Sequence, residues 1–331
     1  MSGGRAVLPT AALALALVTP ACGEAPLTAG ADQPLRVESG QFHEGALPGL
    51  PPLGNDQINA GVAPLTPNVT SLDITGLSII AGESEKTIRG RTSTDASAVA
   101  LRFAESGSGY WVVPVGGPDP VNGGEYTFSL LANVSRDTRP GYHSLLFAGI
   151  GEDGRAGNQG IFRLCVGSPV PDNLNACEPT RAPPALVVSL SWNTDVDLDL
   201  QLLTPDGKLV DAKHPTTDLA TTDHKPDPEA PGVGVLDRDS NAGCQLDSLR
   251  RENLVFATQP APGRYRVHAS LFQACGETSA HFTVSLHSQA SGTEPDTFVQ
   301  VVSAEKRGVL LAAQADGGSK LGLFVTEFVV E

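Results

Sequence analysis

Acidic side chains alternate along one short apolar segment, "DVDLDLQLLTPDG" at residues 195 to 207. Asp195, Asp197 and Asp199 occupy every second position, and the segment closes on a Pro-Asp-Gly turn. In an extended strand they point to one face, while the intervening Val and Leu residues point to the other. Carboxylates about 6.6 to 6.8 Å apart repel one another, and Asp is a poor strand former. The pattern therefore predicts that something compensates these charges.

A second acidic segment, "LDRDSNAGC" at residues 236 to 244, resembles the Asp-x-Asp-x-Asn start of a calcium loop. It is not an EF-hand, because Gly and Glu are missing at the sixth and twelfth positions. Calcium takes six to eight oxygen ligands, which two oxygen-rich segments together can supply. The candidate metal ligands are Asp195, Asp197, Asp199, Asp237, Asp239, Asn241 and Glu252.

Solvation is the alternative to a cation. The polar face of the strand would then be exposed to water, and some aspartates would accept hydrogen bonds from backbone N–H groups of nearby turns. The spacing fits both interpretations and leans toward solvation and turn-capping.

The order of motifs over residues 186 to 288 resembles the bacterial YfaP-like family. These motifs are "LSW", "DVDLDLQLLTPDG", "LDRDSNAGC", "ENLVF" and "PAPGRYRVHASLF". The resemblance implies a β-sandwich accessory domain of a secreted or envelope protein and no particular reaction. This chain has Asp199 where His is common in the family, which adds negative charge. The matching positions are Trp192, Asp195, Asp197, Asp199, Asp206, Gly207, Asp237, Asp239, Glu252, Asn253, Gly263 and Tyr265.

Patterns typical of hydrolases are missing from the sequence. It has no Gly-x-Ser-x-Gly elbow, no His-Glu-x-x-His motif and no Gly-rich phosphate loop before a helix. The one enzymatic alternative is a metal-dependent hydrolase or carbohydrate-active accessory protein that uses the 211 to 229 loop. His214, Asp218, Asp223 and His224 would there ligate zinc. We expect instead that the protein is not an enzyme.

The elements that position these residues are predicted to be strands. With 36 Gly and 26 Pro, the chain has dense turn signals, and its short Val-, Leu- and Thr-rich runs alternate with period 2. We predict an all-β protein with two antiparallel β-sandwich domains, immunoglobulin-like or jelly-roll-like. The first spans residues 68 to 170, a Pro-rich joint spans 171 to 184, and the YfaP-like sandwich spans 185 to 331.

The N-terminal segment predicts export and anchoring. Arg5 precedes the apolar run "AALALALV", which is too short to span a bilayer and reads as a signal peptide. "TPAC" then resembles a lipobox, so we predict a lipoprotein signal over residues 1 to 22 with lipidation of Cys22, and a plain secretory signal is the alternative. Residues 23 to 67 are predicted to be a flexible tether. By analogy with known lipoproteins, Gly23 after the cysteine indicates the outer membrane.

The remaining cysteines indicate an oxidising compartment. Apart from Cys22 the chain has four, an even number, and no Cys-x-x-Cys motif. Three pairings are available, and we predict the sequential one. It joins Cys165 to Cys177 and Cys244 to Cys275.

The net charge of the chain limits which classes of partner it can bind. A net charge of -15 repels phosphate backbones, so we expect no nucleic-acid partner. We expect a non-catalytic cell-envelope lipoprotein, bound to the membrane through Cys22, that presents β-sandwich modules for adhesion, envelope structure or binding of a protein or glycan. A secreted or periplasmic protein is the alternative location.

Overall fold

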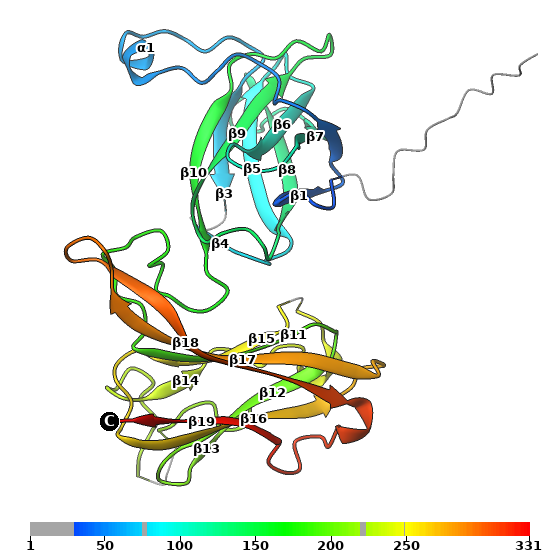
Figure 1. Cartoon of the computed structure of the whole chain (residues 1–331). Helices are drawn as coiled ribbons and strands as arrows, with labels where there is room; N and C mark the ends of the chain where they lie inside the picture. Colours follow the sequence, from blue (N-terminus) through cyan, green and yellow to red (C-terminus); the bar gives the residue numbers. More distant parts are fainter. Residues whose placement is uncertain (1–29, 75–77, 219–222, 248) are drawn as a thin grey trace, which may run out of the picture.

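The protein is all-β, as the sequence predicted. The structure, a computed structural model, describes residues 30–74, 78–218, 223–247 and 249–331. Over these ranges it has nineteen strands, one short α-helix, α1 (Asn55–Asn59), and two 3-10 helices, η1 (Ala242–Cys244) and η2 (Ala312–Gln314). No helix in the described ranges is long and apolar enough to cross a membrane. The predicted signal peptide and Cys22 lie outside the described residues. Figure 1 shows two β domains, one above the other.

The N-terminal domain is a sandwich of two sheets. The first sheet has the order β1 (Leu35–Glu38), β8 (Glu125–Val134), β5 (Lys86–Ser93) and β3 (Val69–Ile74). The second has the order β2 (Gln41–Glu44), β7 (Gly109–Pro114), β6 (Ala98–Phe103), β9 (Gly141–Ile150), β10 (Gly160–Gly167) and β4 (Ser78–Ile80). All pairs are antiparallel except β10 with β4. Alternating residues such as Ile88, Phe103 and Leu145 fill the core between the sheets.

The predicted tether over residues 23 to 67 needs correction from residue 35 onward. Strand β1 pairs with β8, and β2 pairs with β7, so both belong to the N-terminal sandwich. Leu35 and Val37 are buried in its core, and Trp111 donates a hydrogen bond to the Leu35 carbonyl at 2.7 Å. These strands are only four residues long, and the Gly- and Pro-rich chain around them hides their period. The domain therefore begins well before residue 68.

The C-terminal domain is a second two-sheet sandwich. One sheet has the order β14 (Gly234–Leu236), β15 (Arg251–Phe256), β11 (Leu186–Trp192), β17 (Ser279–Ser291) and β18 (Phe298–Leu311). The other has the order β13 (Leu209–Val210), β12 (Asp197–Leu203), β16 (Gly263–Gln273) and β19 (Leu323–Val330). Leu198, Leu200 and Leu202 of β12 point into the core, with Trp192 and Phe256. This confirms the predicted inward face of β12.

The joint between the domains is held at several points. Cys165 at the end of β10 forms a disulfide with Cys177 in the joint, as predicted. On the other side, the Asn175 side-chain amide donates to the Phe298 carbonyl at 3.0 Å, and Gln300 donates to Pro171 at 2.8 Å. The joint is thus tied to the last strands of one domain and to β18 of the other.

Candidate metal centre

Strand β12 is buried on both faces, whereas the solvation interpretation required its acidic face to be exposed to water. Asp197 is 2 % exposed and Asp199 is 6 % exposed. The strand lies between β13 and β16, and the loop after β14 covers its acidic side. Solvation by an open sheet face is therefore wrong for these two carboxylates. Buried carboxylates need a compensating partner, because losing water disfavours their charged form.

Three carboxylates meet at one point. Donor oxygens of Asp197, Asp199 and Asp239 all lie within 4.8 Å of one another. Two of them come from β12 and the third from the loop that follows β14. They open into a cavity of about 200 Å³. Its lining consists of Asp197, Asp199, Gln201, Asp211, Ala212, Lys213, Asp239, Gly243, Phe272 and Gly318.

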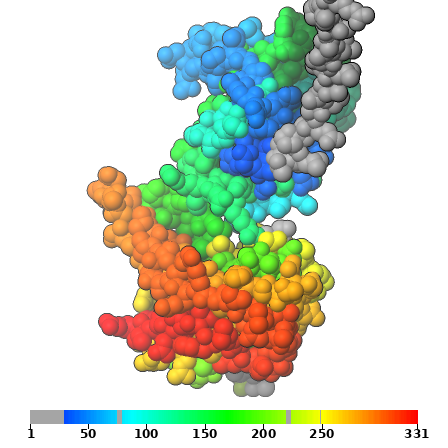
Figure 2. All heavy atoms as spheres, turned by 45° about the vertical axis from the view of Figure 1, so that its right-hand side comes forward, coloured from blue at the N-terminus to red at the C-terminus, as the bar shows by residue number. Residues whose placement is uncertain are grey.

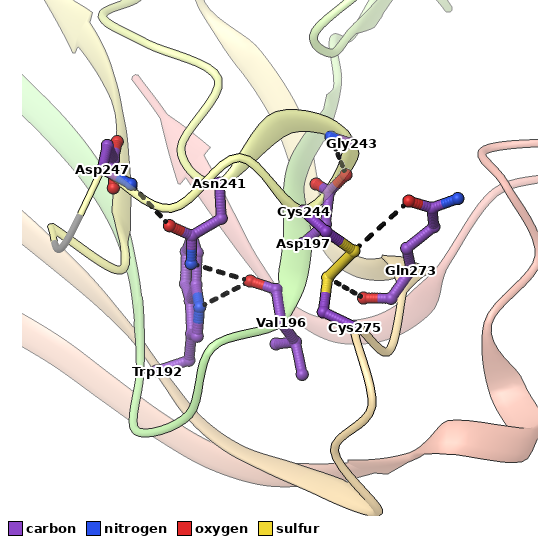
Figure 3. Close-up of a disulfide and its surroundings, with 9 residues drawn as sticks. All are labelled: Trp192, Val196, Asp197, Asn241, Gly243, Cys244, Asp247, Gln273 and Cys275. Atoms are coloured by element: carbon purple, nitrogen blue, oxygen red, sulfur yellow. Dashed lines mark hydrogen bonds between the residues drawn. A yellow bond between two sulfur atoms is a disulfide. The ribbon is translucent and has the colours of Figure 1, made fainter.

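The two oxygens of Asp197 differ in their surroundings. Oδ2 accepts a hydrogen bond from the Gly243 amide at 2.7 Å, a contact drawn in Figure 3. Oδ1 is buried and has no hydrogen-bond partner among the described residues. A buried carboxylate oxygen without a donor is costly, so Oδ1 of Asp197 is placed to bind a cation, a proton or a water molecule.

The cluster resists ionisation. Burial raises the pKa of Asp197 to about 6, a hydrogen bond from Gly243 opposes the rise, and the charge of Asp239 adds to it. Burial, then the charges of Asp197 and Asp239, raise the pKa of Asp199 to about 7. The pKa of Asp239 is also raised, mainly by burial. At neutral pH the cluster therefore gains stability from either a proton or a cation.

Glu252 was predicted to be a metal ligand, but its carboxylate binds the backbone instead. Its side chain is fully buried, its Oε2 accepts from the Leu200 amide at 2.7 Å, and its Oε1 accepts from the Ser240 amide at 3.1 Å. Leu200 follows Asp199 in the chain, and Ser240 follows Asp239. Glu252 thus joins the two acidic segments through their backbones and sets the separation of their carboxylates.

Two further predicted ligands lie outside the cluster. Asp195 forms an ion pair of 2.6 Å with Arg250. Asp237 accepts hydrogen bonds from the backbone and the side-chain amide of Asn253, at 2.9 and 2.8 Å. Asp237 therefore anchors the start of the covering loop to β15, whereas Asp195 belongs to a different surface.

Asn241 and a disulfide fix the rest of the covering loop. The Asn241 side chain donates to the Val196 carbonyl at 3.0 Å and accepts from the Asp247 amide at 3.1 Å. Cys244 is bonded to Cys275 after β16, as predicted. Figure 3 shows these contacts around Asp197. They hold the Gly243 amide against the carboxylate, so Asn241 is a positioning residue.

Asp211 and Lys213 line the cavity and were missed in the sequence. The Pro-Asp-Gly turn makes β12 and β13 a hairpin in which Leu202 pairs with Val210. One residue further in this register, Asp211 lies opposite Gln201. The Pro-Asp-Gly turn predicts such a hairpin, so the position of Asp211 beside the acidic strand could have been predicted from the sequence. The Asp211 charge raises the pKa of Asp199 further and Lys213 lowers it. The Lys213 ammonium donates to the Gly318 carbonyl at 3.2 Å.

The histidines of the 211 to 229 loop do not form a shared centre. His214 pairs with Asp211 at 3.1 Å, and His224 pairs with Asp218 at 2.6 Å. Within the described ranges, Asp197, Asp199 and Asp239 form the only group of three or more His, Cys, Asp or Glu residues with donor atoms this close. The structure therefore brings three aspartates together and does not assemble the alternative zinc set.

Comparison with known proteins assigns no family. No family model and no curated protein matches the chain. One similar solved chain comes from a structure described as manganese lipoxygenase of Gaeumannomyces graminis with partial zonadhesin of Komagataella pastoris. It is 10% identical with a TM-score of 0.20, and the match covers 79% of this chain and 99% of that one. Another, the C-terminal domain of a Streptococcus agalactiae AgI/II polypeptide, is 10% identical with a TM-score of 0.19 and covers 68% and 93%. TM-scores this low assign neither fold nor function, and the YfaP-like resemblance stays a prediction.

Proposed function

We propose that the protein is a non-catalytic, extracytoplasmic binding protein whose C-terminal sandwich holds a calcium ion at Asp197, Asp199 and Asp239. The observation that carries the proposal is the buried, unpartnered Oδ1 of Asp197 inside this three-carboxylate cluster. The cation would join β12 to the covering loop and make the surface above it rigid.

The donor set favours a hard cation. All three donors are carboxylate oxygens, and no His or Cys joins the group among the described residues. Carboxylate and water ligands suit calcium, magnesium and manganese, whereas zinc and copper prefer nitrogen and sulfur. Calcium tolerates irregular coordination and takes bound water, which suits three side chains from two segments.

The proposed location rests on the cysteines and the N-terminal sequence. Two disulfides, Cys165–Cys177 and Cys244–Cys275, suit an oxidising compartment. The lipobox-like "TPAC" supports an anchor at Cys22 in the cell envelope. We propose an outer-membrane lipoprotein that holds its two sandwiches off the membrane for a protein or glycan partner.

Thermal denaturation of the full chain tests the cation. We expect calcium to raise the melting temperature relative to EDTA, and Asp199→Asn to abolish the rise, because it removes one ligand charge. Asp195→Asn, on the same segment but outside the cluster, is the matched control and should keep the rise. A melting temperature indifferent to calcium and EDTA would leave protonation as the compensation for these carboxylates and overturn the proposal.

A further inference from the structure

A second cavity lies where the two domains meet, and its chemistry is the opposite of the first. It has a volume of about 410 Å³, within the range of small-molecule sites. Residues from both domains line it, including Gly82 and Arg136 of the N-terminal domain. Five arginines and no acidic residue are in its lining. The arginines are Arg136, Arg238, Arg250, Arg251 and Arg307.

Two of these arginines are ends of a polar row across the outer face of one sheet. Arg251 of β15 is opposite Ser191 of β11, Ser191 is opposite Thr283 of β17, and Thr283 is opposite Arg307 of β18. Directly opposed residues of antiparallel strands point to the same face. With strands about 4.8 Å apart, the row sets two guanidinium groups at the ends and two hydroxyls between them.

The charges of this cavity are only partly compensated. Arg250 pairs with Asp195, Arg238 with Asp237, and Arg307 with Glu305, and all three carboxylates lie outside the lining. Arg251 instead donates to the Ser189 hydroxyl at 3.3 Å, and no carboxylate lies within ion-pair distance of it among the described residues. A chain with a net charge of -15 thus concentrates cations in one place.

Burial makes this concentration costly. It lowers the pKa of Arg251, and the charges of Arg136 and Arg238 contribute in the same direction. Burial likewise lowers the pKa of Arg136, to which Arg250 adds. Guanidinium groups stay protonated at these positions. The charges of Asp195 and Asp137 oppose the shift of Arg136, and the charge of Asp237 opposes that of Arg251, so an oxyanion in the cavity would add to a partial compensation.

We propose that this cavity binds an oxyanion, a carboxylate, sulfate or phosphate group, carried by a small molecule or by the end of a larger partner. Guanidinium groups bind such anions through paired hydrogen bonds, and the hydroxyls of Ser191 and Thr283 add donors between them. The site uses none of the three clustered aspartates, and the proposal does not rest on the calcium site, although Arg238 lies next to Asp239 on the covering loop.

The joint runs beside the cavity and is tied to both domains. The Cys165–Cys177 disulfide links it to β10, and the Gln300 side chain of β18 donates a hydrogen bond to the Pro171 carbonyl at 2.8 Å. Arg136 and Gly82 of one domain line the same cavity as the arginine row of the other. The ligand contacts both domains at once.

Isothermal titration calorimetry on the full chain tests the site, with inorganic phosphate, sulfate and glucuronate as separate probes at constant ionic strength. Glucose is the uncharged control. We expect saturable binding of at least one anion at millimolar concentration or below and none of glucose. Glucuronate alone would assign a carboxylate ligand, and phosphate or sulfate alone a tetrahedral one. No saturable binding of any of the three anions would overturn the proposal.

Substitutions locate the binding. Arg251→Gln should weaken it about tenfold or more, the value of a lost charge-assisted hydrogen bond. Arg307→Gln should also weaken the binding. Because the Arg307 side chain is exposed, this variant should fold even if Arg251→Gln does not, and it can then test the site alone. Arg264→Gln changes the net charge equally on β16 of the opposite sheet, and should bind as the wild type does. An equal loss in Arg264→Gln, or unchanged affinity in Arg307→Gln and folded Arg251→Gln, would contradict the assignment.

Discussion

Glu252 accepts a hydrogen bond of 2.7 Å from the amide of Leu200, a residue 52 positions away in the chain. The same carboxylate accepts from Ser240, and it is fully buried. The geometry of the candidate metal centre therefore depends on a residue that binds the backbone next to Asp199 and next to Asp239. Glu252 lies on β15 of the C-terminal domain, which forms the lower part of the molecule in Figure 2.

Replacement of this carboxylate should destabilise the protein. In Glu252→Gln a side-chain NH2 group replaces one of the two carboxylate oxygens. Two donors then face each other, and one of the two hydrogen bonds from the backbone is lost. We expect a loss of about 1 to 3 kcal/mol in the free energy of unfolding, measured by urea denaturation. The same variant should bind calcium more weakly, because Asp199 and Asp239 lose their common support.

Glu229→Gln is the control for that experiment, since Glu229 is exposed in the same domain. It should match the wild type in both measurements. If Glu252→Gln were as stable as Glu229→Gln, the positioning role of Glu252 would be refuted.

Metal-free protein should lose stability as the pH rises. The folded-state pKa values of about 6 for Asp197 and about 7 for Asp199 lie above the unfolded value of 3.8. The folded state therefore binds more protons than the unfolded state, and stability falls as the pH rises through these values. In EDTA, we expect a loss on the order of 3 kcal/mol between pH 5 and 8, measured by urea denaturation.

Calcium should remove most of this slope, because the cation replaces the protons. Asp199→Asn in EDTA should also reduce the slope, since the amide does not ionise, while the part due to Asp197 remains. A metal-free stability that rises over this pH range would show that the aspartates are not buried as described.

The Cys244–Cys275 disulfide should support both stability and the cation site. It closes a loop of 31 residues, so Cys244→Ala with Cys275→Ala should cost roughly 3 to 4 kcal/mol in thermal or urea unfolding. Because Gly243 precedes Cys244, its amide should lose its place against Asp197 and calcium binding should weaken. Unchanged calcium affinity in the folded double variant would separate the disulfide from the site.

Lipidation at Cys22 predicts a change of cellular fraction. Cys22→Ala removes the thiol that would carry the lipid, and two or more acyl chains would anchor the protein almost permanently. The variant should move from the membrane fraction to the soluble fraction on immunoblots of fractionated host cells. Membrane association that persists in the variant would defeat the lipoprotein proposal.

Local patterns were enough to predict the fold class and the inward face of β12. Val196, Leu198 and Leu200 alternate strictly, and a half-buried strand needs only that period. The even number of cysteines indicated two disulfides but left three pairings open, of which the structure has the sequential one. Strands β1 and β2 were missed because four-residue strands in a Gly- and Pro-rich segment carry almost no period.

The candidate site was only partly predictable for a different reason. The two acidic segments are evident in the sequence. The alternation of residues, however, does not show whether the polar face of a strand is buried or exposed. Asp195, Asp197 and Asp199 look equivalent in the sequence, yet only two of them lie under the covering loop. Which carboxylates bind backbone amides, as Glu252 and Asp237 do, depends on contacts between distant segments.

Calorimetric titration of calcium into the metal-free full chain tests the central claim most directly. We predict one saturable site, with an affinity in the 10⁻⁴ to 10⁻³ M range of extracellular modules, that Asp199→Asn abolishes and Asp195→Asn retains. Absence of saturable heat in the wild type, or equal binding by Asp199→Asn, would contradict it.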